Sequence, residues 1–264
     1  MSQRQEVDDT MSLTHDPLLL FAVSFLALTL SAWIGVWLAR GRQAVEDEER
    51  EEFGVVQSAT LTLLGLIVGF TFSMALGRYD QRKNYEESEA NAIGTEYLRT
   101  DLLPGPDATK VRALLVDYLD QRILFYDTGD REQLSSTNTQ TWRLQAELWS
   151  AVSAAAVAQP TPLLSLVVAG MNDVLNSQGY TQAAWWNRIP IPAWSLLAAI
   201  AICSIALVGY GARSGKAASR FIFILPLVVS IAFFLIADID SPRGGLIRVR
   251  PQNLLSLAES LHPR

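Results

Sequence analysis

Charged side chains cluster at the ends of two long uncharged segments, and their types and spacing could support chemistry. After one segment come Arg78, Asp80 and Arg82, and after the other come Asp238, Asp240, Arg243 and Arg248. The dipole of a helix disfavours negative charge at its C-terminus, so we expect Asp238 and Asp240 to have cationic partners. Two roles are open for these seven side chains. They could form salt bridges that lock two helix ends together, or a cation site or charged ring at a membrane vestibule.

Other kinds of site are disfavoured by composition. Cys203 is the single cysteine, and the two histidines, His15 and His262, lie near opposite ends of the chain. We therefore expect no disulfide, no metal site and no cofactor. The sequence contains no phosphate-binding loop and no nucleophile–base motif, so we expect no enzyme activity. A pI near 5.0 gives no reason to expect a nucleic-acid partner.

Four segments without any charged residue explain why only 18% of the 264 residues are charged, against about 25% in ordinary soluble domains. They cover residues 17–39, 56–76, 191–212 and 221–237. About 20 apolar residues are needed for a helix to cross a bilayer. We therefore predict an all-α integral membrane protein with four transmembrane helices, 17–39, 56–77, 191–212 and 221–237, and the lipid bilayer as its partner.

The first span is predicted to be retained rather than cleaved as a secretory signal. Acidic residues precede it instead of the basic residues that a signal peptide carries, and no clear cleavage site follows it. Four crossings place both termini and the central segment on one side. Basic residues near the spans are balanced between the two sides, so they give only a weak preference for cytoplasmic termini. A bacterial inner membrane is the expected location.

The segments outside the spans divide into three predicted parts. Residues 1–16 form a polar tail, residues 78–190 a helical extramembrane domain, and residues 241–264 a tail with a Ser-Pro-Arg-Gly-Gly turn. Within the central domain, apolar residues at helical spacing predict a continuation of the second span to about 102. Further helices are predicted from Asp107 to 126, over about 139–158, and from Pro162 onward.

Small residues recur every four positions in the first two spans. The first span contains Ala27, Ser31, Gly35 and Ala39, and the second contains Gly65, Gly69, Ser73 and Gly77. Residues four apart share a helix face, so these faces let another membrane helix approach closely. The partner could be the other span of the same chain or a second copy in a homo-oligomer, and both remain open. Hydroxyls on the second span could line a wet path, although such groups commonly bond their own helix.

Two stretches of sequence resemble the bestrophin-like family of bacterial and plastid membrane proteins. One is LGLIVGFTFSMAL at 64–76, with RYDQR at 78–82 and EANAIGT at 89–95, and the other is DIDSPRGGLIRV at 238–249. The similarity extends over about residues 17–258 and is most specific in these motifs. It implies a four-span architecture with a helical domain between spans two and three.

The resemblance also implies a function. Bestrophins are oligomeric anion channels whose second span lines the pore and forms a hydrophobic neck. On that relation Ile67, Phe70 and Met74 match the constriction, and Ser73 is a further pore-lining candidate. No acidic cluster here matches a bestrophin calcium site, and the charges nearest the membrane are mixed. The sequence therefore supports neither calcium gating nor anion selectivity.

An oligomeric ion channel, with inorganic ions as its ligands, is the function we favour from sequence. The alternative is a non-conducting membrane scaffold or regulator whose helical domain binds a partner. A secondary transporter is less favoured, because the four spans contain no evident inverted repeat.

Overall fold

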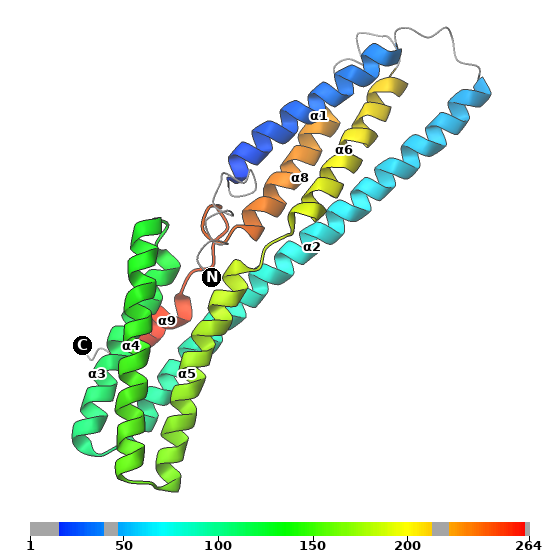
Figure 1. Cartoon of the computed structure of the whole chain (residues 1–264). Helices are drawn as coiled ribbons and strands as arrows, with labels where there is room; N and C mark the ends of the chain where they lie inside the picture. Colours follow the sequence, from blue (N-terminus) through cyan, green and yellow to red (C-terminus); the bar gives the residue numbers. More distant parts are fainter. Residues whose placement is uncertain (1–15, 40–46, 213–221, 262–264) are drawn as a thin grey trace. The chain divides into compact units, whose positions relative to one another are not determined.

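The computed structural model describes residues 16–39, 47–212 and 222–261, and every regular element in these ranges is helical. The elements are α1 (Pro17–Ala39), α2 (Asp47–Arg99), η3 (Thr100–Leu102), α3 (Gly105–Asp127), α4 (Arg131–Ala158), α5 (Pro162–Trp186), α6 (Ile191–Gly211), α8 (Ile224–Asp240) and α9 (Gln252–Leu261) (Figure 1). The all-α prediction is confirmed for the described residues. Almost all of the predicted N-terminal tail, and the predicted start of the fourth span at Phe221, lie outside them.

Three stretches are long and apolar enough to cross a membrane, judged by length and composition. They lie within Pro17–Ala39, Glu51–Leu102 and Pro162–Gly211. The predicted fourth span corresponds to α8, which has 17 residues. At 1.5 Å per residue α8 is about 26 Å long, slightly less than the roughly 30 Å of a hydrocarbon core.

The chain divides into two units. The first contains residues up to Gly77 and Arg188–Arg248, and the second contains Arg78–Asn187 with the C-terminal segment from Val249. α2 belongs to both, because its apolar half ends at Gly77 and its charged half continues to Arg99. In the first unit α1 packs along both α6 and α8 (Figure 1).

Small residues determine how closely α1 and α6 pack. A methyl group on Gly35 would overlap the carbonyl oxygen of Ala206, and one on Gly209 would overlap that of Ala32. Ser31 Oγ donates a hydrogen bond of 2.7 Å to the carbonyl oxygen of Ile202. The small residues of the first span therefore meet α6 of the same chain, where two backbones approach without intervening side chains.

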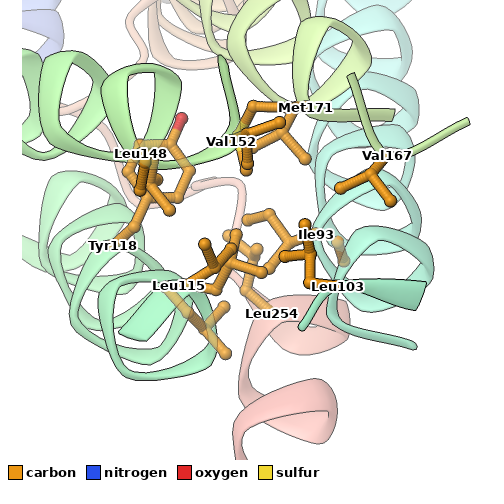
Figure 2. Packing of buried hydrophobic residues seen from close by; sticks show 14 of the residues in the cluster. Ile93, Leu103, Leu115, Tyr118, Leu148, Val152, Val167, Met171 and Leu254 are labelled. Atoms are coloured by element: carbon orange, nitrogen blue, oxygen red, sulfur yellow. The ribbon is translucent and has the colours of Figure 1, made fainter. Parts of the chain in front are cut away.

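The second unit has its own hydrophobic core, shown in Figure 2. Side chains from α2, α3, α4, α5 and α9 meet there, among them Ile93, Leu115, Leu148, Met171 and Leu254. Each of these five residues is no more than 1% exposed. Such burial supplies the driving force that lets a helical segment of this length fold around one core.

Two predicted helix starts in this unit are wrong. α3 begins at Gly105 after the N-cap Pro104, so Asp107 lies in its first turn and is not the cap. α4 begins at Arg131, well before residue 139. Its N-cap is Asp130, whose side chain accepts a hydrogen bond of 2.9 Å from Gln133 N–H. The first turns of α4 are polar, so apolar periodicity does not reveal them.

The predicted start of α5 agrees with the structure. Thr161 is the N-cap, its Oγ1 accepts a hydrogen bond of 3.3 Å from Leu164 N–H, and Pro162 occupies the first turn. The predicted C-terminal tail contains a further element, α9, which sequence analysis missed. Leu254 of α9 is fully buried in the core of the second unit.

Candidate functional site

One broad side of α2 is exposed along the apolar half of the helix. Phe70 is 65% exposed, Leu66 52% and Met74 45%. A methyl group added to Gly65 or Gly69 would meet no neighbouring atom within 4 Å among the described residues, and the same holds at Gly77. These residues form a surface that we call the open face of α2. Its glycines differ from Gly35 and Gly209, whose space is filled by another backbone.

Three of the four residues predicted to line a pore lie on this open face. Phe70, Ser73 and Met74 are exposed, whereas Ile67 is half-buried at its edge. The structure thus brings Phe70 and Met74 together, one turn apart. Whether they face a pore stays a prediction.

The threonine hydroxyls of α2 mostly bond within the helix. Thr62 Oγ1 donates to the Ser58 carbonyl oxygen at 2.8 Å, and Thr71 Oγ1 donates to that of Ile67 at 2.7 Å. Thr60 Oγ1 does the same toward Gln57 at 2.9 Å. These bonds are the common behaviour of hydroxyls in membrane helices, and they leave Ser73 as the hydroxyl on the open face.

The opposite side of α2 is a buried stripe of residues three, four or seven positions apart. Its members on α2 are Leu64, Thr71, Ala75, Arg82, Glu86, Glu89, Ile93 and Glu96. The stripe is mostly apolar before Gly77 and mostly charged after it. Sequence analysis missed the three glutamates, because carboxylates are rarely buried unless paired. The available signal was their helical spacing from Ile93, which does mark a core-facing side.

Glu86 holds the first turn of α9. Its Oε1 accepts hydrogen bonds from the backbone N–H groups of Asn253 at 2.9 Å and Leu254 at 3.0 Å. Its Oε2 accepts a hydrogen bond of 2.6 Å from Nδ2 of the Asn253 side chain. A helix N-terminus has unsatisfied N–H groups and a positive dipole end. Glu86 therefore acts as an N-cap supplied by another helix.

Glu89 lies at the centre of a buried polar network. It pairs with Arg122 of α3 and accepts hydrogen bonds from Tyr126 Oη at 3.3 Å and Thr181 Oγ1 at 3.1 Å. Both ends of the ion pair are fully buried. Burial raises the pKa of Tyr126 above its ordinary range, and the Glu89 charge raises it further. The Tyr126 hydroxyl therefore stays a neutral donor to Glu89.

Glu96 differs from the other two. It is fully buried, but neither carboxylate oxygen has a hydrogen-bond partner among the described residues. The Nη1 atom of Arg99 lies 3.9 Å from its Oε2. Burial raises the pKa of Glu96 from 4.5 to about 8, which favours the neutral acid at neutral pH.

The seven charged residues predicted at the span ends occupy varied positions. Arg82 is buried, and it donates hydrogen bonds of 3.2 Å to the carbonyl oxygens of Ala184 and Asn187 at the end of α5. A cation at a helix C-terminus is favourable. Arg78 is half-buried and Asp80 is exposed, both on α2.

Asp238 organises the turn that follows α8. Its two carboxylate oxygens accept hydrogen bonds from Leu246 N–H at 2.7 Å and Ile247 N–H at 2.8 Å. Gly245 packs directly against Asp238, and a side chain there would come within 2.6 Å of the Asp238 carbonyl oxygen. Ser241 Oγ accepts a hydrogen bond of 3.1 Å from Gly244 N–H inside the same turn. The Ser-Pro-Arg-Gly-Gly motif is therefore part of a turn, residues 241–247, whose backbone N–H groups bind the Asp238 carboxylate. We call it the carboxylate-bound turn.

Asp240 fixes the start of the segment before α6. One carboxylate oxygen accepts a hydrogen bond of 3.0 Å from Ile189 N–H. Arg248 Nε donates 2.8 Å to the Gly245 carbonyl oxygen, so it too belongs to the turn. Arg243 is half-buried within it. Both aspartates accept hydrogen bonds from backbone N–H groups. Salt bridges between these aspartates and nearby arginines stay a prediction.

Within the described ranges no group of three or more histidine, cysteine or acidic side chains is placed to hold a metal ion. Cys203 is exposed on α6. Asp238, Glu86 and Glu89 all accept hydrogen bonds from protein donors. The features that could serve function are therefore the open face of α2, the carboxylate-bound turn and the buried carboxyls.

Comparison with solved structures places this fold in a known class. A crystal structure of a bacterial bestrophin homologue from Klebsiella pneumoniae is 15% identical, with 92% of this chain and 99% of that chain covered and a TM-score of 0.59. A variant of the same homologue gives a TM-score of 0.63 at 13% identity, covering 91% and 93%. A structure described as a membrane protein gives 0.62 at 13% identity, covering 90% and 98%. The chain thus has the all-helical fold of bacterial bestrophin homologues.

A family model described as a Bestrophin-like domain matches residues 23–254. The chain belongs to the Bestrophin-like family, as the two sequence motifs indicated. Comparison with functionally curated proteins finds no match.

Proposed function

We propose that this chain is a four-span membrane protein that assembles into a homo-oligomeric ion channel, with the pore lined by α2. The observation that carries the proposal is the open face of α2. Only 17% of the most apolar window of α2 is buried, against 33% for α1 and 28% for the stretch that includes α6. An apolar helix that its own chain covers so little has surface left for other copies.

The chemistry of the open face suits a pore better than lipid alone. Glycines every four residues let another helix approach closely, which is a main source of association in membranes. Phe70 and Met74, repeated around an axis, would form an apolar constriction that controls water and ion passage. Ser73 adds a hydroxyl beside them. Lipid-facing helices need neither feature.

In this proposal α8 is the fourth span. The termini and residues 78–190 then share one side, which we assign to the cytoplasm of a bacterial inner membrane. The charged residues from Arg78 to Arg82 and from Asp238 to Arg248 lie at that end of the spans. In this proposal the protein has no enzymatic activity.

The test is ion flux through purified protein reconstituted in liposomes. We expect flux from the wild-type chain. Phe70→Ala should increase it, because removal of the ring widens the apolar constriction and makes wetting easier. Phe72→Ala is the matched control, since the same ring is removed from the same helix on the side away from Phe70.

Two results would contradict the channel. One is wild-type liposomes that pass neither anions nor cations, with Phe70→Ala equally silent. The other is an equal change in flux from Phe70→Ala and Phe72→Ala. Such a result would show that ion flux does not depend specifically on the open face of α2.

A non-conducting scaffold is the second candidate, and exposed apolar side chains in the second unit favour it. Trp142, Trp149 and Val157 are exposed on α4. Trp149 also lines a groove of about 730 Å³, together with residues of α4, of α5 and of the connection between them, among them Leu164. Exposed apolar patches often mark protein-binding surfaces. Absence of flux, together with a partner lost on Trp142→Ala, would favour this role.

A further inference from the structure

The strongest unassigned group in the molecule is Glu96, which lies in the second unit, beyond the apolar half of α2. It is fully buried, and its two carboxylate oxygens have no hydrogen-bond donor among the described residues. On the same stripe, Glu86 receives three hydrogen bonds and Glu89 is paired with Arg122. A buried charge without hydrogen bonds is costly, so such a group normally takes a proton instead.

Gly170 of α5 creates the space that Glu96 occupies. A methyl group on Gly170 would overlap both Glu96 Oε2 and Arg99 Nη1. The flanking α5 residues Val167 and Met171 are fully buried and apolar. The backbone of α5 thus closes directly over the carboxyl group, in surroundings that offer it little solvation.

The charges around Glu96 act in opposite directions. Burial is the largest influence on its pKa and raises it to about 8, Arg99 lowers it, and Asp173 of α5 raises it. From the adjoining η3, Asp101 pairs with Arg112 of α3 and is engaged there. Arg99 is the cation that can respond, because it already lies 3.9 Å away and its side chain is 34% exposed.

We propose that Glu96 is a proton-binding site that couples the packing of α5 against α2 to pH. With the proton bound, the neutral acid fits beneath Gly170. When the proton leaves to water, the new carboxylate must gain a partner, so Arg99 moves inward or water enters. Either change is expected to displace the α5 backbone at Gly170, because this backbone packs so closely on Glu96 and Arg99 that even a methyl group on Gly170 would overlap both side chains. An effect of this site on ion flux would rest on the proposed channel function. The proton-binding site itself does not depend on that function.

The first test reads the proton directly. Infrared spectra of the full chain in detergent should contain the carbonyl band of a protonated carboxylic acid, and this band should disappear as the pH rises through about 8. The band should be absent in Glu96→Gln and retained in Glu87→Gln, an exposed position on the same helix. A wild-type spectrum without such a band, or a Glu96→Gln spectrum that keeps it, would overturn the proposal.

Two neighbouring variants should shift the titration in opposite directions. Asp173→Asn removes a negative charge and should lower the midpoint of the acid band, whereas Arg99→Gln removes a positive charge and should raise it. Asp173→Asn keeps the size of the side chain, and Arg99→Gln shortens it but keeps it polar. Midpoints that stay equal in all three proteins would contradict the assignment of the band to Glu96.

The second test reads the coupling. Amide hydrogen exchange of Pro162–Trp186, corrected for intrinsic pH dependence, should speed up in wild type between pH 7 and 9 and stay constant in Glu96→Gln. Equal behaviour of the two proteins would refute coupling even if the infrared titration is seen. Because neither test uses ion flux, failure of the channel proposal would leave both readouts intact.

Discussion

At the scale of single residues, buried charges dominate the second unit. The Glu89–Arg122 pair is fully desolvated, and the Arg122 guanidinium also lies over the Phe125 ring at 4.4 Å. Burial alone would lower the pKa of Arg122, but the nearby Glu89 carboxylate and the tyrosines raise it on balance. Arg122 is therefore a permanent cation on which Glu89 depends.

Removal of Arg122 should accordingly be severe. We expect Arg122→Met to destabilise the protein by about 3–5 kcal/mol, because it leaves Glu89 charged and buried without its cation. Arg143→Met is the matched control, since Arg143 forms an exposed ion pair with Glu147, and solvent-screened pairs of this kind contribute little to stability. Thermal unfolding in detergent measures both. Equal unfolding temperatures for the two variants would show that Glu89 is stabilised by Tyr126 and Thr181 alone.

Residue roles were predictable from sequence only where residue type and burial agree. The turn after Asp238 was expected from Ser-Pro-Arg-Gly-Gly, but the use of Asp238 as its backbone acceptor was not. Sequence suggests charge neutralisation for an aspartate at a helix C-terminus. In the structure, backbone N–H groups of Leu246 and Ile247 fold back to meet it. Such a closure depends on a tertiary turn that residue spacing does not reveal.

At the scale of helices, two sets of glycines behave differently. Gly35 and Gly209 are required by the close contact of α1 with α6, whereas Gly65 and Gly69 meet no neighbouring atom among the described residues. Sequence spacing alone made the two sets look alike. The difference arises because packing partners are set by the tertiary fold.

A pair of alanine substitutions separates these roles. Gly35→Ala should lower the unfolding temperature in detergent, because the new methyl group overlaps the Ala206 carbonyl oxygen in α6. Gly69→Ala should leave it unchanged or stabilise the chain by up to about 1 kcal/mol, since alanine is the better helix former. Loss of stability in Gly69→Ala at dilute protein would mean that the open face of α2 is already occupied.

Helix positions were largely predictable, and helix ends less so. α1, α6 and the extension of α2 to Arg99 follow from uncharged runs and apolar spacing. The start of α4 and the presence of α9 do not, because polar first turns and a ten-residue helix give weak periodic signals. α9 also depends on Glu86, which lies 167 positions away from Asn253.

At the scale of the whole molecule, the open face of α2 makes a prediction about assembly. In a Cys203→Ser background, Ser73→Cys should form disulfide-linked dimers on mild oxidation, if α2 helices of neighbouring copies surround an axis. Leu196→Cys, on the exposed side of α6, is the control and should cross-link much less. Gel electrophoresis without reductant measures both. Equal cross-linking at the two positions would show that the disulfides form by random collision of protein molecules, and not because α2 helices surround a defined axis.

α2 is a single helix of 53 residues, about 80 Å long at 1.5 Å per residue. Its three buried glutamates, Glu86, Glu89 and Glu96, therefore share one side of a continuous helix, with no loop between them that could restore their alignment after an insertion. One residue inserted between Glu89 and Glu96 would rotate Glu96 by about 100° relative to Glu86 and Glu89, whereas seven inserted residues would nearly restore the alignment. Natural length variation in this helix is thus expected to occur in steps of seven.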